Sequence, residues 1–356
     1  MSQFFQSDQN IKSAELKGLK ANNENGNPFR LTTKILALTV DDKDENIIYI
    51  GGAANIAVKI NLKSKAKSIY RGHSGPVTSV VLANIDKDKR LYTGSWDNTI
   101  KMWNAETGDC LATLDKHSDF VKCLLYVPQL NMLFSGSSDK SIIGWEIRPD
   151  LENYHRKVFV LKGHTRGVED LALDTSCPDS GHVWIWSAGS DREIRRWKVG
   201  DTACEDGDAH IGHETSVYRI KIFDNEMWTA SADRTVRRWD LAHGIKEEIK
   251  LEHGDYTRDV VIYQGHAITA CRDEYIRVWN IETGKLIKKI EGHFDDIVAL
   301  QIAGQNLISA SLDQTIRQWP LKDVLDPKIE FKITALENKR AEITDDEERE
   351  LDELME

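Results

Sequence analysis

The chain has 356 residues, a length that allows two ordinary domains or one large repetitive domain. Hydrophobic residues make up 40% and charged residues 29% of the sequence, so we expect a folded globular protein and exclude disordered and collagen-like chains. The formal net charge of −11 argues against coating nucleic acid or an anionic membrane, because both require a basic surface. Nucleic acid is therefore a disfavoured partner, and other proteins or peptides are favoured.

The five cysteines lie far apart and form no CxxC pair, which favours a reducing compartment and gives no zinc framework. The N-terminus lacks the cationic start and apolar run of a signal peptide, and no stretch of about 18 apolar residues follows. We therefore expect an intracellular protein, cytoplasmic or nuclear, with no membrane contact.

Short apolar runs separated by Asp, Asn and Gly turns predict β-strands, as in VTSVVLA (77–83), RLYTGSW (90–96) and TIKMWNA (99–105). Six stretches then share one template: Ser or Thr, Asp four residues later, and Trp six residues beyond that. They occupy 93–104, 135–146, 187–198, 229–240, 269–280 and 309–320. Their tryptophans recur at intervals of 42, 52, 42, 40 and 40 residues, and a histidine precedes each unit. Six of the ten tryptophans in the composition thus belong to an internal repeat.

These units resemble WD repeats, the four-stranded blades of β-propellers, although only Trp239-Asp240 keeps the literal WD pair. A seventh, degenerate unit lies at 47–61, where Ile50, Ala54 and Ile60 replace the hydroxyl, the carboxylate and the indole. Exchanging the polar set as a group is reasonable, because a half-satisfied buried network is worse than none. The resemblance implies an all-β, seven-bladed WD-repeat propeller over residues 31–325.

Ring closure leaves two alternatives. An N-terminal segment, residues 1–30, could supply the last outer strand through IKSAELKGL (11–19), and KIEFKIT (328–334) could do so from the C-terminal side. The resembling family favours the N-terminal strand. Residues 326–356 are expected to form an extension with a short acidic helix at 345–355, either solvated or docked on a partner or on the propeller.

Ser, His and Asp recurring together are typical of hydrolases, but six copies tied to a Trp are better explained by structural hydrogen-bonded tetrads. In each tetrad the indole N–H would reach the hydroxyl, the hydroxyl would reach His, and His would reach Asp. The expected tetrads are His73, Thr93, Asp97, Trp103; His117, Ser135, Asp139, Trp145; His164, Ser187, Asp191, Trp197; His213, Thr229, Asp233, Trp239; His253, Thr269, Asp273, Trp279; and His293, Ser309, Asp313, Trp319.

We find no P-loop, GxSxG, HExxH or EF-hand pattern, so we expect no enzyme and no cofactor. His210 and His213 lie three residues apart beside Asp208 and Glu214, but they lack a third ligand of defined geometry, so we expect no metal site.

In resembling propellers, the narrower face around the central channel commonly binds partners through residues that flank the tetrads. The expected partner-binding rim here is Trp96, Phe120, Lys122, Tyr218, Tyr256, Arg258 and Arg272. Arg258 and Arg272 with aromatic neighbours suit an acidic or phosphorylated peptide, as in propellers that read phosphodegrons. Alternatively, Arg272 pairs with a surface carboxylate such as Asp259 or Glu274.

Trp145-Glu146-Ile147-Arg148 is similar to the WDxR box by which some propellers dock on the adaptor of cullin ligases, with Glu146 in place of Asp. Trp145, Glu146 and Arg148 thus form a possible adaptor box. The sequence favours a non-catalytic interaction scaffold or recognition subunit. The alternatives are a substrate receptor of a cullin-type ubiquitin ligase and a ribonucleoprotein assembly factor.

Overall fold

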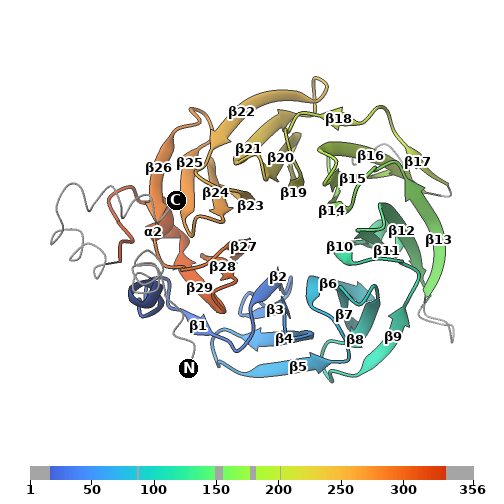
Figure 1. The fold of residues 1–356 in the computed structure, drawn as a ribbon, viewed down its shortest axis with the longest axis horizontal. Helices are drawn as coiled ribbons and strands as arrows, with labels where there is room; N and C mark the ends of the chain where they lie inside the picture. The colour runs from blue at the N-terminus through green and yellow to red at the C-terminus, as the bar shows by residue number, and fades with distance from the viewer. Residues whose placement is uncertain (1–16, 86–87, 149–154, 177–181, 201, 334–356) are drawn as a thin grey trace, which may run out of the picture.

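A computed structural model describes residues 17–85, 88–148, 155–176, 182–200 and 202–333. The chain folds as a seven-bladed β-propeller, which confirms the expected fold (Figure 1). The first strand of each blade lies nearest the central axis, and the fourth lies at the rim. None of the helices in the described segments combines the length and apolar content that a membrane crossing requires.

Each blade is an antiparallel sheet, and the first four blades follow directly along the chain. Blade one contains β2 (Ile35–Val40), β3 (Ile47–Gly52), β4 (Ile56–Asn61) and β5 (Lys67–Arg71). Blade two contains β6 (Val77–Ile85), β7 (Asp88–Ser95), β8 (Ile100–Asn104) and β9 (Cys110–Leu114). Blade three contains β10 (Val121–Val127), β11 (Met132–Ser137), β12 (Ser141–Ile147) and β13 (His155–Lys162), with the 3-10 helix η1 (Pro128–Leu130). Blade four contains β14 (Val168–Leu173), β15 (Val183–Gly189), β16 (Glu193–Val199), β17 (Ala203–Glu205) and a further short strand, β18 (His210–Ile211), on β16.

The last three blades complete the ring. Blade five contains β19 (Val217–Phe223), β20 (Glu226–Ser231), β21 (Thr235–Asp240) and β22 (Lys246–Glu252). Blade six contains β23 (Thr257–Tyr263), β24 (His266–Cys271), β25 (Ile276–Asn280) and β26 (Leu286–Ile290). Blade seven contains β27 (Ile297–Ala303), β28 (Asn306–Ser311), β29 (Thr315–Pro320) and, from the other end of the chain, β1 (Phe29–Arg30). Helix α2 (Leu321–Leu325) follows β29 and buries Leu321 and Val324.

The hydrophobic core lies between neighbouring blades. Ile48, Ile50 and Ile60 of blade one, for example, share a buried cluster with Ile308 and Ile316 of blade seven. A single blade would expose both of its apolar faces, so the blades are stable only when packed around the ring.

The ring is closed by the N-terminal side of the chain. Phe29 pairs with Ile316 and Arg30 with Thr315. The expected stretch 11–19 is not the strand, because residues 17–21 are helical and Lys20 forms an ion pair of 2.5 Å with Glu274 of blade six. The closing strand lies about ten residues further along.

A tight turn before β1 directs the chain into this position. Gly26 has a φ of 69°, and its amide oxygen accepts a hydrogen bond of 2.6 Å from the Gln318 amide. An ideal Cβ on Gly26 would lie 2.6 Å from the Trp319 ring, so only glycine fits between the turn and this indole.

The C-terminal alternative has another position. Phe331 forms a parallel bridge with Ile290 at the edge of blade six, and the Glu291 amide donates to its oxygen at 2.8 Å. Residues 328–333 of this stretch therefore cover blade six and do not close blade seven. The expected helix at 345–355 lies outside the described residues.

Candidate functional site

The structure contains the complete hydrogen-bonded tetrad in five of the six repeat units. In blade two, His73 Nδ1 lies 2.8 Å from Asp97, His73 Nε2 lies 2.7 Å from the Thr93 hydroxyl, and Trp103 Nε1 donates to that hydroxyl at 2.8 Å. The same chain of contacts occurs around His117, His164, His213 and His293. Each tetrad ties the loop that enters a blade to its second and third strands.

The carboxylate is the most heavily bonded member of a tetrad. Asp233 accepts from His213 at 2.8 Å, from the Thr235 hydroxyl at 2.6 Å and from the amides of Glu214 and Thr235. Burial alone would raise the pKa of Asp233, but these hydrogen bonds outweigh it and hold that pKa well below its usual range. The carboxylate therefore stays ionised and organises the turn around it.

Blade six departs from the expected pattern. Arg277 donates to both carboxylate oxygens of Asp273, so Asp273 does not reach His253. His253 Nδ1 donates to the Leu251 carbonyl at 3.1 Å instead, while its Nε2 keeps the Thr269 hydroxyl at 2.8 Å. The prediction of a sixth tetrad is thus wrong at its carboxylate, because a guanidinium two residues before Trp279 competes for it.

The tetrads cannot serve as hydrolase triads, because the hydroxyls of Ser135, Ser187 and Ser309 have no exposed surface. His164, Asp191 and Glu193 are close enough to hold a metal ion, but His164 uses both ring nitrogens for Ser187 and Asp191. Glu193 is occupied by Arg195, at 2.6 Å. These ligand atoms therefore serve the fold.

The histidine pair considered for a metal is also structural. His210 packs edge-on against Trp239 with ring centroids 4.7 Å apart, and His213 belongs to the blade-five tetrad. Burial lowers the pKa of His210. Both rings thus pack against Trp239 of blade five.

Degenerate blade one lacks the tetrad as a whole. The strand register places four apolar residues at the tetrad positions of this blade. Leu31 takes the place of His, Ile50 of Ser or Thr, Ala54 of Asp, and Ile60 of Trp. Ile50 and Ile60 are fully buried, and Leu31 packs against their cluster. An apolar set therefore replaces the polar one without leaving an unpaired group.

We call the face that carries the entry loops and the turns between second and third strands the loop face. Trp96, in such a turn of blade two, stacks on Phe120 of the blade-three entry loop with ring centroids 5.1 Å apart and an interplanar angle of 17°. The two side chains keep 46% and 40% of their surface exposed. They form the aromatic pair of the loop face.

Of the two arginines predicted for the rim, Arg258 is already bound by a carboxylate of the protein. Arg258 donates to Asp296 of blade seven at 2.6 and 2.9 Å and lies 4.7 Å from the centroid of the Tyr218 ring. Burial disfavours its charged form, but the Asp296 contact prevails and raises the pKa of Arg258. Arg258 is therefore fixed by the protein itself.

Arg272 remains more accessible, with 53% of its side chain exposed. It lies over the Tyr256 ring, and its nearest carboxylate is Asp255 at 3.8 Å. Neither Asp259 nor Glu274 is its partner, because Arg219 occupies Asp259 and Lys20 occupies Glu274. The remaining rim cation, Lys122, lies 2.5 Å from Glu169.

The residues of the possible adaptor box lie in β12 and just after it. Trp145 is a tetrad member and is buried. Glu146 accepts from Arg148 Nε at 2.9 Å and from Arg156 at the same distance. Arg148 is 31% exposed. An adaptor would have to compete with Glu146 for it.

Sequence reasoning missed a charged network between the innermost strands. Arg219 of β19 lies 3.5 Å from Asp170 of β14 and 3.3 Å from Asp259 of β23. Asp170 and Asp259 also accept the amides of Ile220 and Leu300, each in the next blade. The sequence does contain a signal for this network. Asp170 and Asp259 each lie two residues after the first residue of an inner strand, at a β-bulge.

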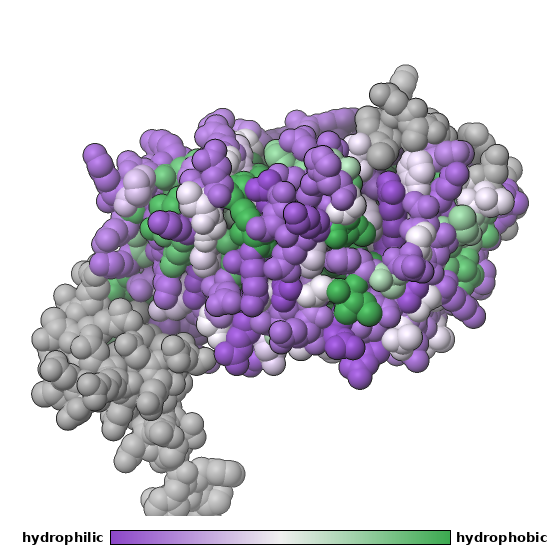
Figure 2. Space-filling model, turned by 90° about the horizontal axis from the view of Figure 1, so that it is seen from above, coloured by the Kyte–Doolittle hydropathy of each residue, from purple (hydrophilic) through white to green (hydrophobic). Residues whose placement is uncertain are grey.

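The side of the propeller seen in Figure 2 is mostly hydrophilic, with separate hydrophobic patches. A hollow of about 610 Å³ between blades one and seven is acidic, with Asp41, Asp42, Asp44 and Glu45 in its lining. On the loop face, between blades four and five, a second hollow of about 380 Å³ contains Arg166 and Arg192. Neither hollow is predicted by the sequence, because each combines residues from two blades.

Comparisons with known proteins agree with this geometry. The family model described as WD domain, G-beta repeat matches residues 64–104, 108–146, 208–240 and 284–320. A WD repeat-containing protein of Schizosaccharomyces pombe, C126.01c, is 38% identical over 371 aligned residues, covering 99% of this chain and 98% of the yeast protein.

Other relatives match only in part. The ribosome biogenesis protein YTM1 of Meyerozyma guilliermondii is 35% identical over 36% of this chain and 27% of its own length. A WD repeat-containing protein 26 homolog of Arabidopsis thaliana is 25% identical over 82% of this chain and 48% of its own length. The chain thus spans less than half of either of these two proteins.

Proposed function

Because the chain belongs to the WD-repeat family of β-propellers, we propose that it is a non-catalytic scaffold or recognition subunit that holds a partner protein on its loop face. Propellers of this family typically act as interaction scaffolds and are generally non-catalytic. The tetrads use the Ser, His and Asp side chains for the fold, and this supports a binding role over a catalytic one.

The observation that carries the proposal is the aromatic pair. Trp96 and Phe120 come from different blades, stack on each other and remain about half exposed. Trp is enriched among the residues that dominate interface energies, and an exposed ring stack is a preorganised, low-entropy contact area. Two hydrogen bonds hold the backbone of both residues in place: the Asp97 amide donates to the Ser95 hydroxyl, and the Ser138 amide donates to the Phe120 carbonyl. Neither bond involves the aromatic rings.

Crosslinking affinity purification of the full chain tests the proposal. Trp96→Ala with Phe120→Ala should weaken partner binding by about 2 kcal/mol or more, roughly 30-fold, as expected for a hot spot. The matched control is Phe223→Ala with Leu111→Ala, which removes two other exposed apolar side chains. Crosslinks that map away from the loop face, or equal losses in both double variants, would refute the proposal.

A substrate receptor for a cullin-type ligase that reads acidic or phosphorylated peptides remains a second candidate. Arg272 supports it, as a half-exposed guanidinium backed by Tyr256, and so does the partly exposed Arg148. Arg148→Glu should then abolish co-purification of a ligase adaptor and leave other partners unchanged. Unchanged adaptor recovery would remove this candidate.

The likeness to YTM1, whose name assigns it to ribosome biogenesis, supports a third candidate: a ribonucleoprotein assembly factor. Association with such particles should be lost on nuclease treatment if it runs through RNA. Association that persists after nuclease points to protein contacts instead.

A further inference from the structure

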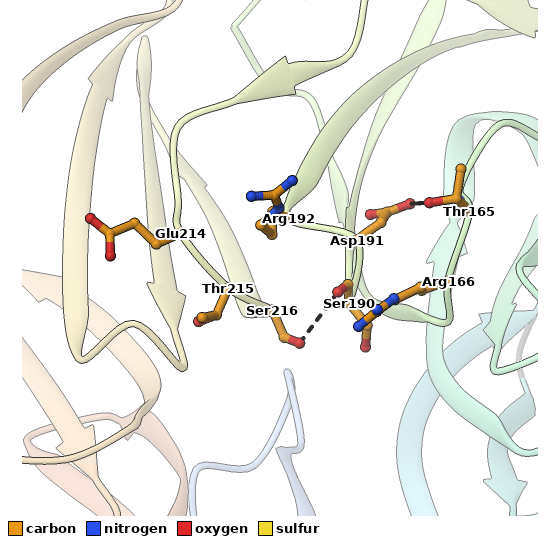
Figure 3. A pocket seen from close by; sticks show the side chains of 8 residues that line it. All are labelled: Thr165, Arg166, Ser190, Asp191, Arg192, Glu214, Thr215 and Ser216. Carbon is orange, nitrogen blue, oxygen red and sulfur yellow. Dashed lines mark hydrogen bonds between the residues drawn. The ribbon is translucent and has the colours of Figure 1, made fainter.

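A polar pocket on the loop face lies between blades four and five. It is formed by the entry loop of blade four, the turn between β15 and β16, and the entry loop of blade five, and it encloses about 380 Å³ (Figure 3). Its lining is Thr165, Arg166, Ser190, Asp191, Arg192, Glu214, Thr215 and Ser216. No large apolar side chain takes part, so the pocket suits a small polar group rather than a hydrophobic anchor.

Two arginines supply its positive charge. Arg166 and Arg192 are exposed, and neither forms an ion pair or a side-chain hydrogen bond with any residue in the described part of the chain. Three other arginines of these blades are paired: Arg195 with Glu193, Arg196 with Asp174 and Arg237 with Glu247. The positive charge of the pocket is therefore available to a ligand.

The two carboxylates of the lining do not cancel this charge. Asp191 is directed at His164, at 3.0 Å, and accepts the Thr165 amide at 2.7 Å, and its side chain is 3% exposed. Glu214 points away from the other labelled side chains, whereas Arg166 extends over Ser190 (Figure 3). An anion bound beside Ser190 would thus meet the Arg166 guanidinium, with Arg192 in the same lining, and would not face a free carboxylate.

Hydroxyl groups complete the lining. The Ser216 hydroxyl donates to the Ser190 carbonyl only at 3.5 Å, and the Thr165 hydroxyl reaches Asp191 at the same distance. Both bonds are at the limit of hydrogen-bond length and are readily exchanged for a better acceptor. Guanidiniums combined with hydroxyl donors match the oxygens of a phosphoryl group.

We propose that this pocket binds the phosphoryl group of a phosphorylated serine or threonine on a partner protein. The inference rests on the proposed function, because it names the class of partner that the loop face recognises. A phosphorylated peptide is favoured over a polyanion such as nucleic acid, because acidic residues lie on both sides of the two arginines. Arg166 lies two residues after the tetrad histidine of its entry loop. The equivalent position is Asp119 in the entry loop of blade three and Asp255 in that of blade six. One dianion fits in the pocket, and a phosphate backbone running around the ring is repelled.

Fluorescence anisotropy with degenerate phosphopeptides tests the pocket in the full chain. The probes are a labelled pool with phosphoserine or phosphothreonine at one fixed position and the same pool without phosphate. The wild-type protein should prefer the phosphorylated pool by at least about tenfold, and Arg166→Ala with Arg192→Ala should reduce this preference to about twofold or less. Millimolar inorganic phosphate should compete with the pool for the wild-type protein.

The charge-matched control is Lys140→Ala with Arg234→Ala. These exposed cations stand at the position of Arg192 in the turns of blades three and five and do not line the pocket. This control variant should keep the wild-type preference for the phosphorylated peptide pool. Equal losses in both double variants indicate general charge attraction and overturn the proposal, as does wild-type protein without a phosphate preference. Partner binding that depends on Trp96 and Phe120 but not on phosphate would leave the proposed function intact.

Discussion

Removing the carboxylate of one complete tetrad tests the structural reading of the repeat most directly. In the Asp233→Ala variant, His213 loses the acceptor of its Nδ1–H, and Thr235 loses the partner of both its amide and its hydroxyl. The His213 side chain has no exposed surface, so water cannot replace the carboxylate there. The loss also removes one partner of the buried Arg237.

The magnitude follows from these contacts. A buried polar group left without a partner costs about 1–3 kcal/mol, and each further lost hydrogen bond about 0.5–1.5 kcal/mol. The amide of Glu214 lies on an exposed loop and regains water, so it adds little. We therefore expect Asp233→Ala to lower the free energy of unfolding by about 3 kcal/mol.

Urea unfolding followed by tryptophan fluorescence and circular dichroism measures this change. The matched control is Asp240→Ala in the same blade, which removes the aspartate of the literal WD pair. Among the residues that the structure describes, the Asp240 side chain bonds only to the exposed His243 and the Ala242 amide, so its loss should be much smaller. A midpoint for Asp233→Ala equal to that of the wild-type protein, or a larger loss in the control, would refute the tetrad as a stabilising unit.

Two further outcomes follow from single residues. Burial, reinforced by the charge of Arg277, lowers the pKa of His253 to about 3, so between pH 6.5 and 3 the unfolded chain binds a proton that the folded chain does not. Stability should thus fall by about 2 kcal/mol from pH 7 to pH 5 through this group, and urea unfolding of His253→Asn should show a correspondingly flatter pH profile. Gly26→Ala should destabilise the protein by about 2–3 kcal/mol, because the new Cβ meets the Trp319 ring in addition to the unfavourable positive φ. Gly108→Ala, with a φ of 84° and nothing within 4 Å, should show only the backbone part, about 1 kcal/mol, and equal thermal shifts in the two variants would contradict the ring-closing role of the turn.

The sequence predicts the ring well because each unit repeats the same local chemistry. Spacing alone identifies five complete tetrads and the exchanged set of blade one, since those residues must meet inside one blade. It does not predict contacts between blades. The Arg258–Asp296 pair and the Asp170–Arg219–Asp259 network join residues 38 to 49 positions apart, whose relative placement depends on the ring. The pocket around Arg166 has the same origin, because it combines loops from two blades.

Blade six explains how one blade can lose its tetrad while keeping every residue of the template. In blade five, Arg237 finds Glu247 on the outer strand at 2.7 Å, and Asp233 stays with His213. By register, the position of Glu247 next to Trp239 is taken in blade six by Leu286 next to Trp279.

The outer strand LIKKI of blade six carries no carboxylate at all. Arg277 is buried and pairs with Asp273, so Asp273 is not available to His253. Blade four shows the opposite outcome. Arg195 pairs with Glu193 and Glu205, so Asp191 remains bonded to His164. In blades four, five and six, the tetrad forms where the arginine two residues before its tryptophan finds a carboxylate outside the tetrad. In blade seven, Arg317 bonds instead to Asn23 Oδ1 and the Asn25 carbonyl, and Asp313 stays with His293.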